Sequence, residues 1–253
     1  RMLMTMKASI EALRCLIYLN AQAVDVAHHH PDDDERQRGQ ELTDLLTPLS
    51  KGWGTDLGNE LTSLGVQVHG GMGYIEETGA AQHYRDIRIA AIYEGTNGIQ
   101  AMDLVGRKLP MRNGDVVADL IGEMGTTVAS LHHAGLGDIG DRLEAAAADL
   151  QAASRWLLEK GAGGTDDGLA GATPYLRMFG TTVGAWLLGK SALAAHQLRE
   201  DPSASEFDDE FLQAKIATAR FFASQILPQV HGLLPAVTAG ADGLYAVSVD
   251  ALR

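Results

Sequence analysis

Three short segments in the first half of the chain carry residues whose types and spacing could do chemistry. They are Gly65 to Tyr74, Tyr84 to Arg88 and Ile92 to Gln100. The first offers a glycine-lined backbone that a cofactor could approach closely, because glycine has no side chain and tolerates positive φ. The third places the carboxylate of Glu94 directly before a glycine. Beyond it, a predicted helix start at Gly98 to Leu104 would offer free backbone N–H groups, which favour an anion or a phosphate.

Taken together, the segments resemble the acyl-CoA dehydrogenase family. The C-terminal helical domain of that family carries Gln-x-x-Gly-Gly-x-Gly, then Arg-Asp, then Tyr-Glu-Gly-Thr with a nearby Ile-Gln, and all these blocks occur here in order. The resemblance covers roughly residues 1–109. It implies an all-α fold: the C-terminal helical bundle of an acyl-CoA dehydrogenase, without the helix that should precede Arg1, followed by an additional C-terminal helical domain. The expected domains are therefore 1–109 and 110–253, and the start within a helical pattern suggests a piece of a longer protein.

The same resemblance implies a role for each matching residue. Glu94 would remove the α-proton of an acyl-CoA thioester while the β-hydrogen leaves as hydride to FAD, which yields a trans-2-enoyl-CoA. Such an α-proton is weakly acidic, so the carboxylate must meet it in a dry pocket. Gly95 would line the substrate. FAD contacts are implied for two groups: from the same subunit Thr96, Asn97 and Gly98, and from a neighbouring subunit Gln67, Val68, His69, Gly70 and Gly71. A homodimer follows from that arrangement.

The sequence beyond Leu109 resembles the helical C-terminal domain of a longer subclass of the family, and residues 71–82 and 103–108 are similar to segments of that subclass. That subclass includes 3-methylmercaptopropionyl-CoA dehydrogenases of dimethylsulfoniopropionate degradation, besides relatives that act on fatty acyl-CoA in β-oxidation. We rank the sulfur-containing substrate slightly ahead. An electron-transferring flavoprotein is the implied electron acceptor, and we expect the isolated fragment to be inactive. Two alternatives stay open: an acyl-CoA oxidase, which passes electrons to oxygen, and a non-catalytic helical interaction fragment.

Other reactive side chains in the sequence have simpler interpretations. Glu76 and Glu77 lie in a predicted helix start, where they would favour the helix dipole and solvent. Arg85 and Asp86 are expected to form a structural ion pair with each other. His69 could contact the cofactor or simply pack. The histidines His28, His29 and His30 are assigned to the solvated surface. The lone Cys15 is assigned to core packing.

Composition excludes several functional classes. The formal net charge of −13 gives no support to a nucleic-acid footprint, which needs clustered Lys and Arg. No run of about 18 apolar residues is present, so we expect no membrane span. One cysteine permits no intrachain disulfide or cysteine-built zinc site, and we expect a reducing, cytoplasmic location. Few aromatic residues and much Ala and Leu favour helix-on-helix packing.

Apolar periodicity predicts where the helices lie. Leu3, Ile10 and Ile17 recur with Met6 and Leu13 on one helical face, which we expect to be buried. Residues 28–40 are expected to be a helix end and a loop, and Thr47-Pro48 to begin the next helix. A bundle of four Ala-rich helices is predicted over residues 116–133, 139–160, 169–199 and 206–230, with a flexible connection at 161–168.

Overall fold

The computed structural model describes residues 1–160, 165–201, 203 and 205–252. Within these ranges the chain contains helices and turns and no β-strand, so the predicted all-α fold is confirmed. None of the described helices is long and apolar enough to cross a membrane.

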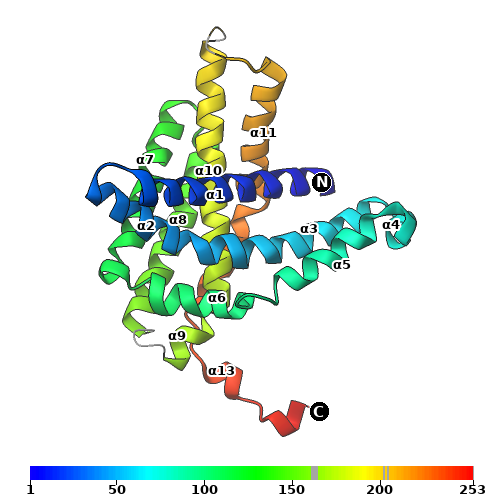
Figure 1. The fold of residues 1–253 in the computed structure, drawn as a ribbon, viewed down its shortest axis with the longest axis vertical. Coiled ribbons are helices and arrows are strands. Elements are labelled where there is room, and N and C mark those ends of the chain that lie inside the picture. The colour runs from blue at the N-terminus through cyan, green and yellow to red at the C-terminus, as the bar shows by residue number, and fades with distance from the viewer. Residues whose placement is uncertain (161–164, 202, 204, 253) are drawn as a thin grey trace.

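The first part of the chain forms a long hairpin of helices and then a shorter return pair. Its elements are α1 (Met2–His29), α2 (Asp33–Pro48), the π-helical turn η1 (Leu49–Trp53), α3 (Gly54–Val68), α4 (Gly71–Tyr74), η2 (Glu76–Thr78), α5 (Ala80–Ala90), α6 (Asn97–Asp103) and the π-helical η3 (Leu104–Lys108). In Figure 1, α1 and α3 run across the molecule, and α3 and α5 form an arm that ends at α4.

The second part supplies the predicted bundle. Its elements are η4 (Met111–Gly114), α7 (Asp115–His133), α8 (Gly137–Lys160), α9 (Asp166–Ala170), α10 (Ala172–Glu200), α11 (Asp209–Gln225), η6 (Leu227–Gly232), α12 (Leu234–Val237), α13 (Asp242–Tyr245) and η7 (Val249–Leu252). The helices α7, α8, α10 and α11 pack together, and α10 lies across α1 (Figure 1). The expected connection is partly helical, because α9 begins at Asp166; residues 161–164 lie outside the described residues.

The prediction that Thr47-Pro48 begins a helix is wrong. The helix instead runs through Pro48 from α2 into η1 and α3, and the Thr47 hydroxyl donates to the carbonyl of Thr43 within the helix. Proline in a helix interior costs about 3 kcal/mol. The turn that follows buries Leu49 and Trp53 in the core, and burial of one large apolar side chain contributes about 1.5–3 kcal/mol. Burial of these side chains in the core therefore offsets the free-energy cost of a proline inside the helix. Residues 33–40, expected to be loop, also belong to α2.

The predicted buried face of α1 is also wrong. Leu3, Ile10 and Ile17 are exposed, and Met6 and Leu13 are only half-buried. The buried stripe of α1 consists of small residues with one leucine: Ala8, Ser9, Ala12, Leu16 and Ala23. Small side chains let α10 approach closely, as a Cβ added at Gly184 would lie 3.2 Å from the Cβ of Ala12. Periodicity identifies a face of a helix, but close packing selects which face is covered.

One continuous core joins the two parts of the chain. The largest buried side chains include Trp186, Tyr175 and Phe179 of α10, and the same cluster contains Leu16, Leu46 and Leu104 from the first part. At the crossing, the Trp53 ring lies against Gly180, where an added Cβ would be 2.3 Å from the Trp53 Cγ atom. The glycine is required by this contact.

We predict that Gly180→Ala lowers the free energy of unfolding by about 1–3 kcal/mol or more, because the added methyl group overlaps the Trp53 ring. Gly125→Ala, in the middle of α7 where no atom lies within 4 Å of an added Cβ, should raise it by about 0.5–1 kcal/mol. Urea unfolding of both variants tests this, and equal effects of the two substitutions would contradict the close crossing.

A second contact between the parts is electrostatic. Lys7 and Lys215 donate to opposite oxygens of the Glu11 carboxylate at 2.6 and 3.0 Å. Burial opposes ionisation of Glu11, but these hydrogen bonds and the two positive charges outweigh it and lower the pKa of Glu11. A lowered folded pKa means that Glu11 stabilises the fold above its unfolded pKa and loses this effect as the pH falls through the folded pKa.

We therefore predict that Glu11→Gln lowers the free energy of unfolding at pH 7, and that its difference from the unsubstituted chain shrinks as the pH falls through the folded pKa. Urea unfolding as a function of pH measures this. Glu144→Gln, on the exposed face of α8, should show neither effect. If Glu11→Gln lowered the free energy of unfolding by the same amount in acid as at pH 7, ionised Glu11 would be ruled out as the cause.

Candidate functional site

Glu94 lies at the tip of a short closed loop between α5 and α6. The carbonyl of Ala91 accepts two hydrogen bonds that close the base of the loop, from the backbone N–H of Asn97 at 3.2 Å and from the Thr96 hydroxyl at 3.0 Å. Glu94 itself has φ +52° and Gly95 has φ +78°. A left-handed conformation costs a residue other than glycine about 1–2 kcal/mol. Such strain persists only where the surroundings impose it, and it clusters at functional sites.

The carboxylate of Glu94 is free for chemistry. Glu94 is exposed, and its side chain makes no hydrogen bond or ion pair with the described residues. Gly95 follows it and is also exposed; its carbonyl accepts a 3.4 Å hydrogen bond from the Gln100 side chain. The dry surroundings that proton abstraction needs are therefore not provided by the described part of this chain.

The side chain of Asn97 anchors the loop to η1 and to the start of α3. Its carbonyl oxygen accepts from Lys51 at 2.9 Å, and its amide donates to Gly52 at 3.1 Å and to Asp56 at 2.6 Å. The Thr55 hydroxyl lies within hydrogen-bond distance of both ends of the amide. This side chain is thus fully employed within the chain. Only the exposed backbone of Thr96 and Gly98 remains available for the predicted contact with FAD.

Lys51, Thr55 and Asp56 were not identified from the sequence. Their only signal was that Lys51 and Thr55 are four residues apart in a predicted helix, which places them on one face. Which helix lies opposite that face is decided by the fold.

The glycine motif lies at the far end of α3. Gly73 is buried, and a Cβ there would lie 2.2 Å from the carbonyl oxygen of Val66, so this glycine serves the chain's own packing. Gly70 and Gly71 are exposed and have no atom within 4 Å of an added Cβ. These two glycines therefore leave an open backbone that a ligand or another chain can approach.

The remaining residues of the motif surround that open backbone. Val68 and His69 are exposed, and the Nδ1–H of His69 donates to the carbonyl of Gly65 at 2.8 Å, which leaves Nε2 directed elsewhere. Gln67 is exposed and makes no hydrogen bond with the described residues.

The two predicted groups of cofactor residues do not come together in one chain. Gln67 to Gly71 lie at the α4 end of the α3–α5 arm, whereas Glu94 to Gly98 lie at its base (Figure 1). The length of α5 separates them, about 16 Å at 1.5 Å per residue. A single chain therefore presents two separate surfaces.

The structure corrects the predicted ion pair of Arg85 and confirms the packing role of Cys15. Arg85 does not pair with Asp86; its guanidinium lies 3.0 Å from the carboxylate of Glu76, because neighbouring helical residues point in different directions. Cys15 is half-buried against the core, where burial raises the pKa of its thiol, and this confirms its assignment to packing. No cluster of three metal-ligating side chains occurs among the described residues.

We predict that Asn97→Ala lowers the free energy of unfolding by about 1–3 kcal/mol, because Asp56 and the carbonyl of Gly52 lose their hydrogen-bond partner. Asn59→Ala is the matched control. Asn59 is equally half-buried but makes one hydrogen bond and leaves its side-chain oxygen unpaired, so its loss should cost much less. Urea unfolding compares them; similar losses would show that the Asn97 network does not hold the loop.

Comparisons with known proteins agree with this architecture. Residues 1–109 match the family model described as "Acyl-CoA dehydrogenase, C-terminal domain", and residues 120–248 match "Acetyl-CoA dehydrogenase C-terminal like". The chain is 42% identical over 98% of its length to 3-methylmercaptopropionyl-CoA dehydrogenase of Ruegeria pomeroyi, of which it covers 42%. It is 31% identical over 94% of its length to a butyryl-CoA dehydrogenase of Syntrophomonas wolfei, of which it covers 39%.

A solved structure shows the same fold. The Caenorhabditis elegans protein ACDH-11, crystallised with C11-CoA, matches with a TM-score of 0.66 and 17% identity over 87% of this chain and 35% of that one. The chain spans about two fifths of the length of the curated relatives it matches. With both parts of its helical fold matched by family models, this chain belongs to the acyl-CoA dehydrogenase family.

Proposed function

We propose that this chain forms part of an enzyme that carries out flavin-dependent α,β-dehydrogenation of an acyl-CoA thioester to a trans-2-enoyl-CoA, with Glu94 as the base. The observation that carries the proposal is the strained, left-handed backbone of Glu94 at the tip of a closed loop in a member of this family. The loop exposes a carboxylate that has no partner among the described residues, so a substrate held by other parts of the protein can meet it.

The chemistry assigned to the chain's own residues is proton abstraction. The Glu94 carboxylate accepts the α-proton, and the electron pair of the broken C–H bond forms the new double bond as the β-hydrogen leaves. FAD, when bound, accepts that β-hydrogen as hydride. Gly95 permits the positive φ that follows Glu94 and would lie beside the thioester, although the Gln100 amide already borders the space where a side chain would be, 2.9 Å from an added Cβ. Closure of the loop by Ala91 and Asn97 fixes the direction of the carboxylate.

Only some of the residues proposed to contact FAD have groups free to do so. The open backbone of Gly70 and Gly71 suits close approach of a cofactor, whereas the side chains of Thr96 and Asn97 already make hydrogen bonds within the chain. We therefore assign contacts with FAD to the backbone of Thr96 and Gly98, whereas Asn97, whose backbone N–H and side chain are both bonded within the chain, would support the cofactor by holding the loop. The separation of Gln67 to Gly71 from the Glu94 loop supports a homodimer, in which these residues meet the flavin of the neighbouring subunit.

For the substrate we favour 3-methylmercaptopropionyl-CoA over a straight-chain acyl-CoA, on the strength of 42% identity along nearly the whole chain. We propose an electron-transferring flavoprotein as acceptor and a cytoplasmic location. An acyl-CoA oxidase is the alternative with the same fold, and peroxide production by the intact enzyme distinguishes it. The second alternative is a non-catalytic interaction fragment. Failure of the intact, flavin-loaded protein to turn over any acyl-CoA would favour this alternative.

We propose the division into residues 1–109, which carry the catalytic loop, and residues 110–253, which serve packing and assembly. The backbone at the boundary is distinctive, since Arg112, Asn113 and Gly114 all have positive φ. Arg112 forms ion pairs with Glu41 of α2 and Asp119 of α7, and thereby ties the connection to both parts.

We predict that Glu94→Gln lowers turnover of 3-methylmercaptopropionyl-CoA and of butyryl-CoA by about 10²–10⁴-fold, the usual contribution of a general base. Glu77→Gln should leave turnover unchanged, because this exposed carboxylate forms no ion pair with the part of the chain that the structure describes. The flavin absorbance of both variants is measured alongside, so that loss of cofactor is told apart from loss of the base. Full turnover by a flavin-loaded Glu94→Gln enzyme would refute the assignment.

A further inference from the structure

The loop that carries Glu94 is attached to the rest of the chain through the side chain of Asn97. Asn97 lies three residues after Glu94, and its backbone N–H closes the loop on the carbonyl of Ala91 at 3.2 Å. Its side-chain amide reaches across to η1 and to the start of α3. The direction in which the loop presents Glu94 therefore depends on what holds this amide.

Two side chains of opposite charge hold the amide from its two ends. Lys51 donates to the carbonyl oxygen of Asn97 at 2.9 Å, and the amide NH₂ donates to the carboxylate of Asp56 at 2.6 Å. An ammonium group has only donors and a carboxylate only acceptors, so the two ends of the amide cannot be exchanged. The carbonyl of Gly52, which accepts from the same NH₂ at 3.1 Å, requires the same orientation. The amide is thereby fixed in one direction.

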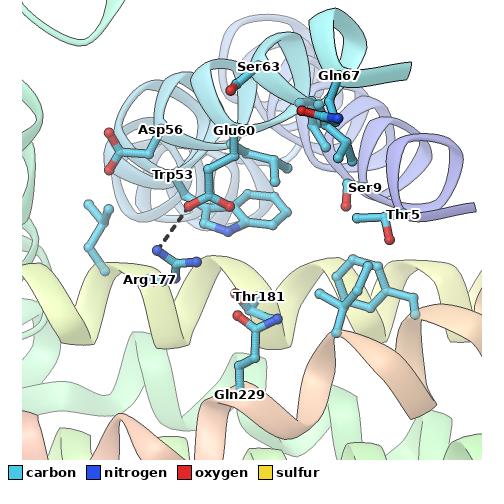
Figure 2. A pocket seen from close by; sticks show the side chains of 16 residues that line it. Thr5, Ser9, Trp53, Asp56, Glu60, Ser63, Gln67, Arg177, Thr181 and Gln229 are labelled. Atoms are coloured by element: carbon cyan, nitrogen blue, oxygen red, sulfur yellow. Dashed lines mark ion pairs between the residues drawn. The ribbon is translucent and has the colours of Figure 1, made fainter. Parts of the chain in front are cut away.

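Neither charge is used elsewhere in the described part of the chain. The half-buried ammonium of Lys51 and the exposed carboxylate of Asp56 form no ion pair there. Asp56 borders a cavity of about 460 Å³ between α3 and α10, which Arg177 also lines. Arg177 pairs with Glu60 at 3.0 Å, however, and the Asp56 side chain points away from that pair (Figure 2). Hydrogen bonds to charged groups are the stronger ones, and here both are made to one neutral amide.

The backbone of the loop needs such an anchor. Glu94 and Gly95 have φ of +52° and +78°, and a left-handed residue other than glycine keeps that conformation only where its surroundings impose it. A catalytic group that is misplaced by about 1 Å can slow a reaction about 10²-fold. Loss of the anchor would therefore affect the rate before it affects the fold.

We propose that Lys51 and Asp56 are positioning residues for the reaction: they hold the Asn97 amide from opposite ends and so fix the direction of the Glu94 carboxylate. The inference rests on the function proposed for Glu94. It assigns to Lys51 and Asp56 no contact with the substrate or the cofactor, so their whole effect on the rate passes through Glu94.

The first test follows reduction of the flavin after anaerobic mixing of the intact, flavin-loaded enzyme with butyryl-CoA. The rate constant measures the chemical step, and the amplitude measures the fraction of active enzyme. Lys51→Met keeps most of the length of the side chain but removes its donors, so it should lower the rate constant about 10- to 10²-fold at unchanged amplitude. Asp56→Ala removes the acceptor at the other end of the amide and should act in the same direction.

Lys108→Met is the matched control. Lys108 is also half-buried, and it pairs with an acidic residue of a neighbouring helix, Asp44, at 3.6 Å. Its replacement should leave the rate constant of flavin reduction unchanged, because this lysine does not contact the Glu94 loop.

A second test inverts the polarity of the anchor. Asn97→Asp keeps the shape of the side chain but places an acceptor opposite the Asp56 carboxylate and the Gly52 carbonyl, so the rate constant should fall about 10²-fold. Asp56→Asn in the same chain restores a donor toward position 97. The double variant should therefore reduce its flavin several-fold faster than Asn97→Asp alone.

Hydrogen exchange gives a readout that does not depend on activity. The backbone N–H of Asn97 is bonded to Ala91 within the loop. Opening of the loop exposes such groups to exchange. Lys51→Met should therefore speed exchange in peptides that cover residues 92–98, and Lys108→Met should not.

Glu94→Gln separates this inference from the proposed function. In a chain that already carries Glu94→Gln, Lys51→Met should have no further effect on the rate constant, because the carboxylate that it positions is gone. A Glu94→Gln enzyme that reduces its flavin at the full rate would overturn the proposed function and the inference with it. A slow Glu94→Gln enzyme beside full-rate Lys51→Met and Asp56→Ala enzymes would overturn the inference alone.

Three further outcomes would also overturn the inference. A lower amplitude with an unchanged rate constant in Lys51→Met would show that Lys51 serves stability only. An equal effect of Lys51→Met with and without Glu94→Gln would show that Lys51 acts on something other than the base. Unchanged hydrogen exchange over residues 92–98 would show that the loop is held without Lys51.

Discussion

Trp53 lies where η1 runs into α3 beneath α10, and its ring occupies the space that Gly180 and Gly184 leave free. The rest of the structure depends on this contact. It holds the first part of the chain against the second, and Trp53 lies two residues from both Lys51 and Thr55, which hydrogen-bond to Asn97. Because Asn97 closes the loop that carries Glu94, the position of the candidate base is linked through one helix to the packing of the tryptophan.

The same crossing explains why the helix passes through Pro48 instead of beginning there. A free helix would stop at or before this proline. Here the wide turn after it brings Leu49 and Trp53 into the shared core, where their burial exceeds the cost of the interrupted backbone. The turn also directs Lys51 toward α6. An irregularity of the backbone thus serves both the core and the candidate site.

The chain presents its chemistry on surfaces that it does not itself cover. Glu94 and the glycines Gly70 and Gly71 are exposed, and so are apolar residues nearby such as Tyr74 and Ile99. This distribution agrees with the proposal that flavin, substrate and a neighbouring subunit meet at these surfaces. By contrast, the cavity beside Trp53 is formed within the chain by both of its parts.

The sequence by itself determined the family, the all-α class and the residue expected to act as base, since these rest on local blocks of residues and on helical periodicity. It predicted the bundle helices well, since α7, α8, α10 and α11 begin and end within about five residues of the predicted ranges. Only the tertiary structure decided which face of α1 is buried, that Pro48 lies within a helix, and that Arg85 pairs with Glu76. It also decided that Asn97 is held by Lys51 and Asp56. These features depend on which surfaces meet at close range, and local spacing carries no information about the partner that a face will find.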